Sequence, residues 1–228
     1  MNETSTLSAV LFDFDGVLAE TDEYHFLSWR PVAARLGIPW ERAFYDARLR
    51  GLGRDEAVAV LIAQFELGVE ARARETLLAA KNAEFQRLIQ RGELHLCSGA
   101  VELVEAIKGS GLLVAVGSSS RNAAFLLRHM GVCDLFDAVV DRNDAPGKPS
   151  PAIYGKVAGL LHVALQECLV VEDTELGARS ARAAGMAVIG IGQPDHLPSC
   201  QGTVRSIRDL TVGRLIDYHG AWWARTDR

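Results

Sequence analysis

Residues 13–18 read Asp13-Phe14-Asp15-Gly16-Val17-Leu18 and follow directly on the apolar run Ala9–Phe12. The apolar run predicts a buried strand, and the glycine predicts a bend after the two carboxylates. Two carboxylates at the end of a buried strand are poorly suited to a core. They are well suited to holding a divalent cation and to attacking a phosphate. One such pair is a weak signal, so the rest of the chain has to support it.

Two later apolar runs also end in polar groups. Ser118 follows residues 112–116, and the pair Glu172-Asp173 follows residues 169–171. Ligands of open α/β sheets bind outside the carboxyl ends of the strands, so these groups can converge on one crevice. Three strand ends with compatible chemistry make a strong signal.

From residue 98 onward, helical and strand patterns alternate. Alternation of this kind predicts the α/β fold class, with a parallel sheet that has helices on both faces. The Ser150-Pro151 pair is a helix-start signal, with serine as the N-cap. The expected strands cover residues 9–12, 112–116, 138–140, 169–171 and 187–191, and the expected helices cover residues 99–108, 122–130, about 151–161 and 176–184.

Residues 21–90 show a different sequence pattern, with several helical stretches and no convincing strand. We expect an all-helical cap domain over residues 20–92, inserted into a core domain of residues 1–19 and 93–228. Pro31 removes an internal hydrogen bond from the first of these helices, so we expect a kink there. The cap helices are expected at residues 23–36, 55–66 and 70–90.

The bulk properties exclude several classes of protein. The chain has 228 residues and a formal net charge of −5, which argues against nucleic acid or an anionic membrane as a partner. The opening residues have no basic segment, and the first apolar run is too short for a signal or a membrane span. The four cysteines lie far apart and form no zinc-binding spacing. We expect a soluble, cytoplasmic, monomeric protein.

The acidic groups suit one type of chemistry. Mg²⁺ is held by a few carboxylates and keeps positions open for phosphate oxygens. Asp13 and the pair Glu172-Asp173 supply such carboxylates at neighbouring strand ends. One aspartate can then act as a nucleophile and form an aspartyl phosphate, while its neighbour Asp15 moves protons. Taken alone, the pair at 172–173 would be read as ordinary solvated loop residues.

Three further segments are candidates for binding phosphate. The run Ser118-Ser119-Ser120-Arg121-Asn122 offers hydroxyls and backbone N–H groups at a helix start. Lys148 lies in a stiff loop next to a proline and could balance the acids, although a lone lysine is more often a surface residue. Arg54 stands at the start of a helix, where the dipole disfavours a cation unless an anion is bound, and Gly51 beside it allows close approach. A solvated arginine remains the alternative there.

The motifs resemble those of the haloacid dehalogenase superfamily of phosphotransferases. Four motifs match in order, namely DFDGVL, the serine of GSSSRN, the lysine of GKPSP and the acidic pair of VVEDT. This resemblance implies a Rossmann-like core with a helical cap inserted after the first strand, and it implies Mg²⁺ as cofactor.

Residues 13–38 and 49–58 look most like the β-phosphoglucomutase-like subgroup. The subgroup has lysine where this chain has Arg50 and Arg121, and serine where it has Gly53. The resemblance implies a role for each matching position. The catalytic residues would be Asp13 (nucleophile), Asp15 (acid/base), Ser118 and Lys148; the metal would bind Asp13, Asp15 through its carbonyl, Glu172 and Asp173; and the substrate would contact Thr21, His25, Trp29, Arg50, Gly51, Arg54, Lys81, Ser120, Arg121 and Asn122.

The sequence therefore predicts an enzyme that interconverts hexose 1-phosphate and 6-phosphate through phospho-Asp13, with a small phosphorylated sugar as its partner. A phosphatase for a small sugar phosphate would use the same four motifs and remains the alternative. A non-catalytic binding protein is disfavoured because neither Asp13 nor Asp15 is missing.

Overall fold

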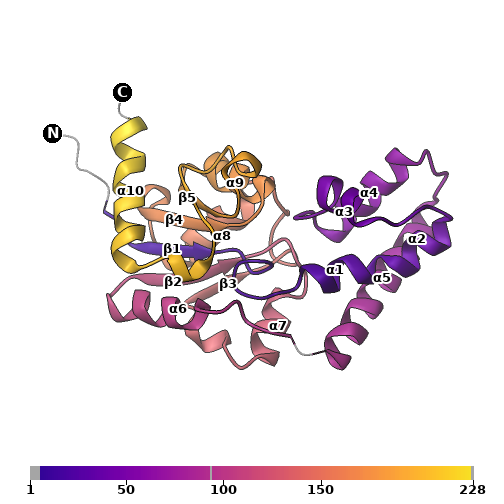
Figure 1. Cartoon of the computed structure of the whole chain (residues 1–228), viewed down its shortest axis with the longest axis horizontal. Helices are drawn as coiled ribbons and strands as arrows, with labels where there is room; N and C mark the ends of the chain where they lie inside the picture. The colour runs from indigo at the N-terminus through magenta and orange to yellow at the C-terminus, as the bar shows by residue number, and fades with distance from the viewer. Residues whose placement is uncertain (1–5, 93, 227–228) are drawn as a thin grey trace. The chain divides into compact units, whose positions relative to one another are not determined.

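The computed structural model describes residues 6–92 and 94–226 (Figure 1). The chain forms two compact units. A core unit comprises the described residues of Met1–Ala19 and Leu96–Arg228, and a helical unit comprises those of Glu20–His95. None of the helices in the described part of the chain is both long and apolar enough to cross a membrane.

The core unit is built on one parallel sheet of six strands in the order β3-β2-β1-β4-β5-β6. Central β1 pairs with β2 on one side and β4 on the other, so Leu11 lies in register with Ala115 and Val170. The strand order reverses beside β1, which makes its carboxyl end a topological switch point. The strands are β1 (Ala9–Phe12), β2 (Leu113–Gly117), β3 (Ala138–Val140), β4 (Cys168–Glu172), β5 (Ala187–Ile191) and β6 (Thr203–Val204).

Helices cover both faces of this sheet (Figure 1). On one face, α8 (Ala152–Leu161) and α9 (Glu175–Ala183) pack against Leu11, Ala115 and Val170. On the other, α6 (Ala100–Gly109) and α10 (Val212–Thr226) contact β2, β5 and each other. The fifth helix of this unit is α7 (Ala123–His129), and short 3₁₀ turns lie at Cys133–Leu135, Leu165–Glu167, Pro194–His196 and Ile207–Asp209. The predicted α/β class is confirmed.

All regular elements described in the helical unit are helices, namely α1 (Asp22–Ser28), α2 (Arg30–Leu36), α3 (Arg42–Arg48), α4 (Arg54–Gln64) and α5 (Ala71–Arg91). They enclose an apolar cluster of their own that includes Phe26, Trp29, Tyr45 and Leu61. Rings of Phe26 and Trp40 stack with centroids 5.6 Å apart. The unit therefore has a core independent of the sheet.

Two expectations about elements need correction, and three elements were missed. The single kinked helix expected at residues 23–36 is two helices separated at Trp29, and Pro31 lies in the first turn of α2, where its missing N–H costs no hydrogen bond. The N-cap position of α8 belongs to Pro151, although Ser150 Oγ still accepts the N–H of Ala152 at 3.3 Å. Helices α3 and α10 and strand β6 were not predicted at all.

Candidate active site at the carboxyl edge of the core sheet

Asp13 is the first residue after β1, and its backbone holds its side chain in place. Its N–H donates to the carbonyl of Val171 at 3.0 Å, which continues the pairing with β4. Its Oδ1 accepts the N–H of Phe14 at 2.7 Å. The side chain is buried, with 6% of the residue exposed. A carboxylate held this firmly at a switch point suits a group that must meet a ligand in one orientation.

Asp15 and Ser118 meet at the same edge of the sheet. Ser118 follows β2, is fully buried and donates from Oγ to Asp15 Oδ2 at 3.4 Å. Gly16 turns the chain away with a φ of +80°, and its N–H donates to the carbonyl of Ala19 at 2.9 Å. The turn therefore separates the strand from the helical unit just after the two carboxylates.

Lys148 is buried between two of the acids. Its Nζ lies 2.7 Å from Asp13 Oδ1 and donates to Glu172 Oε1 at 2.5 Å, and only 1% of the residue is exposed. The backbone N–H of Lys148 donates to Ser119 Oγ at 3.0 Å. Ser119 was not singled out among the serines of its run, because nothing in the run distinguishes the one that holds the lysine loop.

The carboxylate of Glu172 accepts an unusual number of hydrogen bonds. Oε1 accepts from Lys148 and from the hydroxyl of Tyr154 at 2.6 Å. Oε2 accepts from the N–H of Asp173 at 3.2 Å and from the N–H and the Oγ1 of Thr174 at 3.3 and 3.1 Å. Sequence reasoning missed Tyr154, because a tyrosine inside an apolar helix is ordinarily read as a core residue.

The acids form a cluster that fits a divalent cation. One oxygen from each of Asp13, Glu172 and Asp173 lies within 4.8 Å of the others. A side chain at Gly16 would collide with the carboxylate of Asp173, so the turn and the cluster are packed closely together. An all-oxygen set with several negative charges is the kind of donor set that Mg²⁺ takes in proteins.

Electrostatics in this cluster act on three groups. Burial, followed by the charge of Glu172, raises the pKa of Asp13 well above its usual range, although Lys148 opposes the shift. Burial disfavours the charged form of Lys148, but Asp13 and Glu172 outweigh it and raise the pKa of the ammonium. Burial and then the charge of Glu172 raise the pKa of Tyr154, so its hydroxyl stays protonated and donates.

The loop after β2 has hydrogen bonds among its own residues that were not expected. Ser118 Oγ accepts the N–H of Ser120 at 3.0 Å, and Ser120 Oγ accepts the N–H of Asn122 at 3.2 Å. Two of the backbone N–H groups expected to face an anion are therefore already hydrogen-bonded. Arg121 donates from Nη1 to Asn143 Oδ1 at 3.2 Å, and Asn143 donates back to the Arg121 carbonyl at 3.0 Å.

The helical unit brings three predicted residues together. Lys81 is buried, with its Nζ 2.9 Å from His25 Nδ1 and 5.7 Å from the ring centroid of Trp29. His25 stacks on Phe85 with centroids 4.5 Å apart, and Lys81 Nζ lies 4.6 Å from the same ring. Thr21 is fully buried, and its carbonyl accepts the N–H of His25 at 3.0 Å.

The predicted cap loop lies between α3 and α4. Helix α4 begins at Arg54, so the arginine occupies the first helical position as expected. Gly51 has a φ of +80°, a conformation that favours glycine. Arg50 Nε lies 3.5 Å from Asp22 Oδ1 on α1, which holds this bulkier residue against its own unit.

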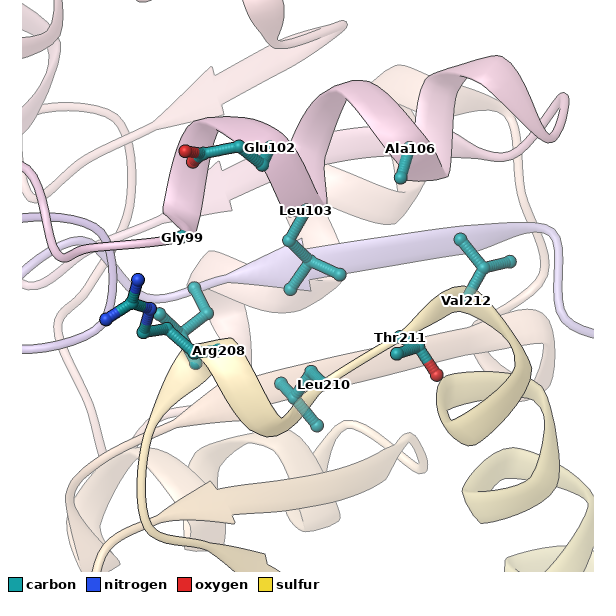
Figure 2. Close-up of a pocket in the computed structure, with 9 residues that line it drawn as sticks. Gly99, Glu102, Leu103, Ala106, Arg208, Leu210, Thr211 and Val212 are labelled. Atoms are coloured by element: carbon teal, nitrogen blue, oxygen red, sulfur yellow. The ribbon is translucent and has the colours of Figure 1, made fainter.

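A separate pocket of about 360 Å³ lies in the core unit between α6 and the segment that leads into α10 (Figure 2). Figure 2 shows Glu102 and Arg208 at one end and Val212 at the other, with the Leu103 side chain between the two segments. None of the predicted site residues lines this pocket, whose walls are formed by Gly99, Glu102, Leu103, Ala106, Ile207, Arg208, Leu210, Thr211 and Val212.

Known proteins match the chain over most of its length. The family model for haloacid dehalogenase-like hydrolases matches residues 7–185. A β-phosphoglucomutase of Bacillus subtilis (strain 168) is 34% identical over 220 residues, which cover 95% of this chain and 96% of that protein. A fructose-1-phosphate phosphatase of Escherichia coli (strain K12) is 28% identical over 190 residues, or 81% of this chain and 96% of that protein.

Solved structures agree with these matches. The crystal structure of a β-phosphoglucomutase from Clostridium difficile superposes with a TM-score of 0.89 at 25% identity, covering 96% of this chain and 99% of that one. The resemblance predicted from the four motifs, and from the segments at residues 13–38 and 49–58, is confirmed.

Proposed function

The chain belongs to the haloacid dehalogenase-like hydrolase family, and we propose that it interconverts a hexose 1-phosphate and 6-phosphate through an aspartyl phosphate on Asp13. The observation that carries this proposal is the buried arrangement of Asp13, Lys148 and Glu172 at the switch point of the sheet. The β-phosphoglucomutase that matches 95% of the chain supports the choice of reaction.

In the proposed reaction, a carboxylate oxygen of Asp13 attacks the phosphorus, and the bond from phosphorus to the sugar oxygen breaks. Asp15 donates a proton to that leaving oxygen and, in the return step, takes a proton from the attacking sugar hydroxyl. Ser118 Oγ donates a hydrogen bond to Asp15 Oδ2, which supports this role by fixing one carboxylate oxygen of Asp15. Lys148, positioned on Asp13 Oδ1, would offset the charge of the transferring phosphoryl group.

Mg²⁺ is the cofactor that we propose for the acidic cluster. Asp13, the carbonyl of Asp15, Glu172 and Asp173 form the set of residues that would hold it. When bound, it would neutralise the clustered acids and polarise the phosphoryl group.

A mutase must bind two phosphates in its bisphosphate intermediate, whereas a phosphatase needs only one. We assign the phosphate that is not transferred to Arg54, with Ser120, Arg121 and Asn122 as partners from the core unit. Trp29 and Lys81 would line the sugar pocket, Arg50 and Gly51 would shape its loop, and Thr21 and His25 would control when Asp15 engages. Lys81 Nζ lies 2.9 Å from His25 Nδ1, so these two residues are neighbours within the helical unit.

Hydrolysis of a small sugar phosphate is the second candidate. It would use the same aspartyl phosphate with water as the acceptor. The fructose-1-phosphate phosphatase that matches 81% of the chain favours it.

Arg54→Ala separates the two candidates. Loss of a charged hydrogen-bonding partner for the second phosphate should cost about 2 kcal/mol, or roughly 30-fold in kcat/KM for the mutase reaction. Hydrolysis of a small generic phosphate ester, which has no second phosphate, should change little. Arg48→Ala, at an exposed arginine of α3, is the matched control. Equal losses in both reactions would show that Arg54 does not bind a second phosphate.

A further inference from the structure

Asn143 lies in the turn that follows β3, at the carboxyl edge of the core sheet. Its side-chain amide contacts Arg121 at two points. Oδ1 accepts from Arg121 Nη1 at 3.2 Å, and Nδ2 donates to the Arg121 carbonyl at 3.0 Å. A guanidinium is planar and its donors form a rigid fork, so holding one N–H together with the backbone restricts the direction in which the whole group points.

The turn that carries Asn143 is itself held by hydrogen bonds. Asp141, which is 4% exposed, accepts the N–H of Asn143 on Oδ1 at 2.8 Å. The N–H of Asp141 donates to Asp144 Oδ2 at 3.1 Å, and the N–H of Asp144 donates to the Asp141 carbonyl at 2.9 Å. The amide of Asn143 therefore extends from a fixed backbone, as a residue that orients a neighbour requires.

A second contact joins the same two loops. Ser119 Oγ accepts the N–H of Lys148 at 3.0 Å, so the loop after β2 is bonded to the loop after β3 at Ser119 as well as at Arg121. In the proposed function, Lys148 acts on the phosphoryl group that is transferred and Arg121 binds the other phosphate. The two contacts thus fix residues that are proposed to bind opposite ends of one bisphosphate.

We propose that Asn143 is a positioning residue that orients Arg121 toward the phosphate that is not transferred. This inference rests on the proposed function, which assigns Arg121 to that phosphate. A neutral amide suits the task, because it accepts from the guanidinium without offsetting the positive charge that attracts a phosphate, as a carboxylate would. The carboxylates of Asp141 and Asp144 bind backbone N–H groups of the turn instead.

The test compares the wild type with Asn143→Ala, Arg121→Ala and the double variant. It measures kcat and KM for isomerisation of β-glucose 1-phosphate, and the rate of p-nitrophenyl phosphate hydrolysis. We expect Asn143→Ala to raise KM about three- to tenfold with kcat nearly unchanged, because binding of a non-reacting phosphate is weakened. Hydrolysis of p-nitrophenyl phosphate, which has no second phosphate, should change little. In the Arg121→Ala background, Asn143→Ala should raise KM no further, since its effect passes through the guanidinium.

Lys156→Ala is the matched control. Lys156 Nζ donates to the Asp144 carbonyl at 2.8 Å, so this variant removes a hydrogen bond from the same turn without removing either contact to Arg121. Its KM should equal that of the wild type. Asn143 is exposed, so its truncation leaves no cavity and the melting temperature of Asn143→Ala should stay close to that of the wild type. Equal increases of KM in Lys156→Ala and Asn143→Ala would show that the turn as a whole is responsible, and would overturn the inference.

Two other results would overturn this inference alone. One is a wild-type KM in Asn143→Ala, and the other is the same increase of KM with and without the Arg121 side chain. An unchanged KM in Arg121→Ala would instead overturn the assignment of Arg121 to the second phosphate, and this inference with it. Absence of isomerisation in the wild type would overturn the proposed function as well.

Discussion

At the scale of single residues, neighbouring groups shift the pKa of Asp13 in opposite directions, and a bound cation would favour its ionised form. Burial and the charge of Glu172 raise its pKa, while Lys148 lies 2.7 Å from its Oδ1. A nucleophilic carboxylate must be ionised, so the raised pKa works against the proposed reaction in the metal-free protein. A divalent cation in the cluster favours the ionised form and removes this conflict.

The raised pKa predicts how Mg²⁺ stabilises the protein at different pH. A carboxyl group whose folded pKa exceeds its unfolded value of about 4 contributes stability at low pH and loses that contribution as the pH rises through the folded pKa. Mg²⁺ binds the ionised form of Asp13. The increase in melting temperature on adding Mg²⁺ should therefore be larger at about pH 7.5 than at about pH 5.5.

The control for that measurement is Asp13→Asn, which keeps the shape of the side chain and cannot ionise. Its increase in melting temperature should be smaller and should depend less on pH. Equal increases for the wild type at both pH values would contradict the assignment of a cation to Asp13.

At the scale of elements, the start of α9 is shaped around Glu172. A side chain at Gly177 would overlap the Glu172 carboxylate, so the helix comes close only because this position is glycine. Thr174 caps the same helix by accepting the N–H of Gly177 at 3.2 Å. The helix thereby supports the carboxylate that receives Lys148.

Gly177→Ala should destabilise the core unit by about 1–3 kcal/mol and also lower phosphoryl transfer, because the new methyl group displaces Glu172. Gly159→Ala in α8 is the matched control, since nothing lies within 4 Å of its added Cβ. That variant should gain about 0.5–1 kcal/mol from helix propensity. Urea denaturation measures the change in the free energy of unfolding for both variants. A Gly177→Ala variant as stable as the wild type would contradict the close approach of α9 to Glu172.

Elements also show where sequence patterns carry information and where they do not. Long apolar runs predicted the parallel strands, because strands buried on both faces are apolar throughout. Strand β6 has only two residues, Thr203 and Val204, which is too short for any pattern. The seven-residue helix α3 is likewise too short for a clear helical period. Pro31 was read as a kink because a proline inside a helical pattern removes a hydrogen bond, whereas a new helix begins at Arg30 and Pro31 lies in its first turn.

Sequence patterns predicted some residues of the candidate site and missed others. Spacing and strand ends pointed to Asp13, Ser118, Lys148 and the acidic pair, and the structure brings these residues together in the core unit. Tyr154 and Ser119 could not be found this way, because their roles depend on which atoms their hydroxyls meet in three dimensions. No repeating pattern in a sequence indicates which partner a hydroxyl group will contact.

At the scale of the whole molecule, the predicted site residues are divided between two compact units. The core unit carries the acids, Ser118 and Lys148, and the helical unit carries Arg54 and the cluster of Trp29, His25 and Lys81. Hydrolysis requires the first set with water as acceptor. A mutase requires both sets around one bisphosphate, with water excluded so that phospho-Asp13 is not hydrolysed.

The most direct test is to incubate the protein with Mg²⁺, β-glucose 1-phosphate and a trace of the 1,6-bisphosphate, and to follow glucose 6-phosphate and free phosphate together. We predict glucose 6-phosphate without phosphate release in the wild type, and a loss of about 10⁴-fold or more in Asp13→Asn. Release of phosphate without isomerisation would contradict the mutase assignment, and undiminished turnover by Asp13→Asn would contradict the aspartyl phosphate itself.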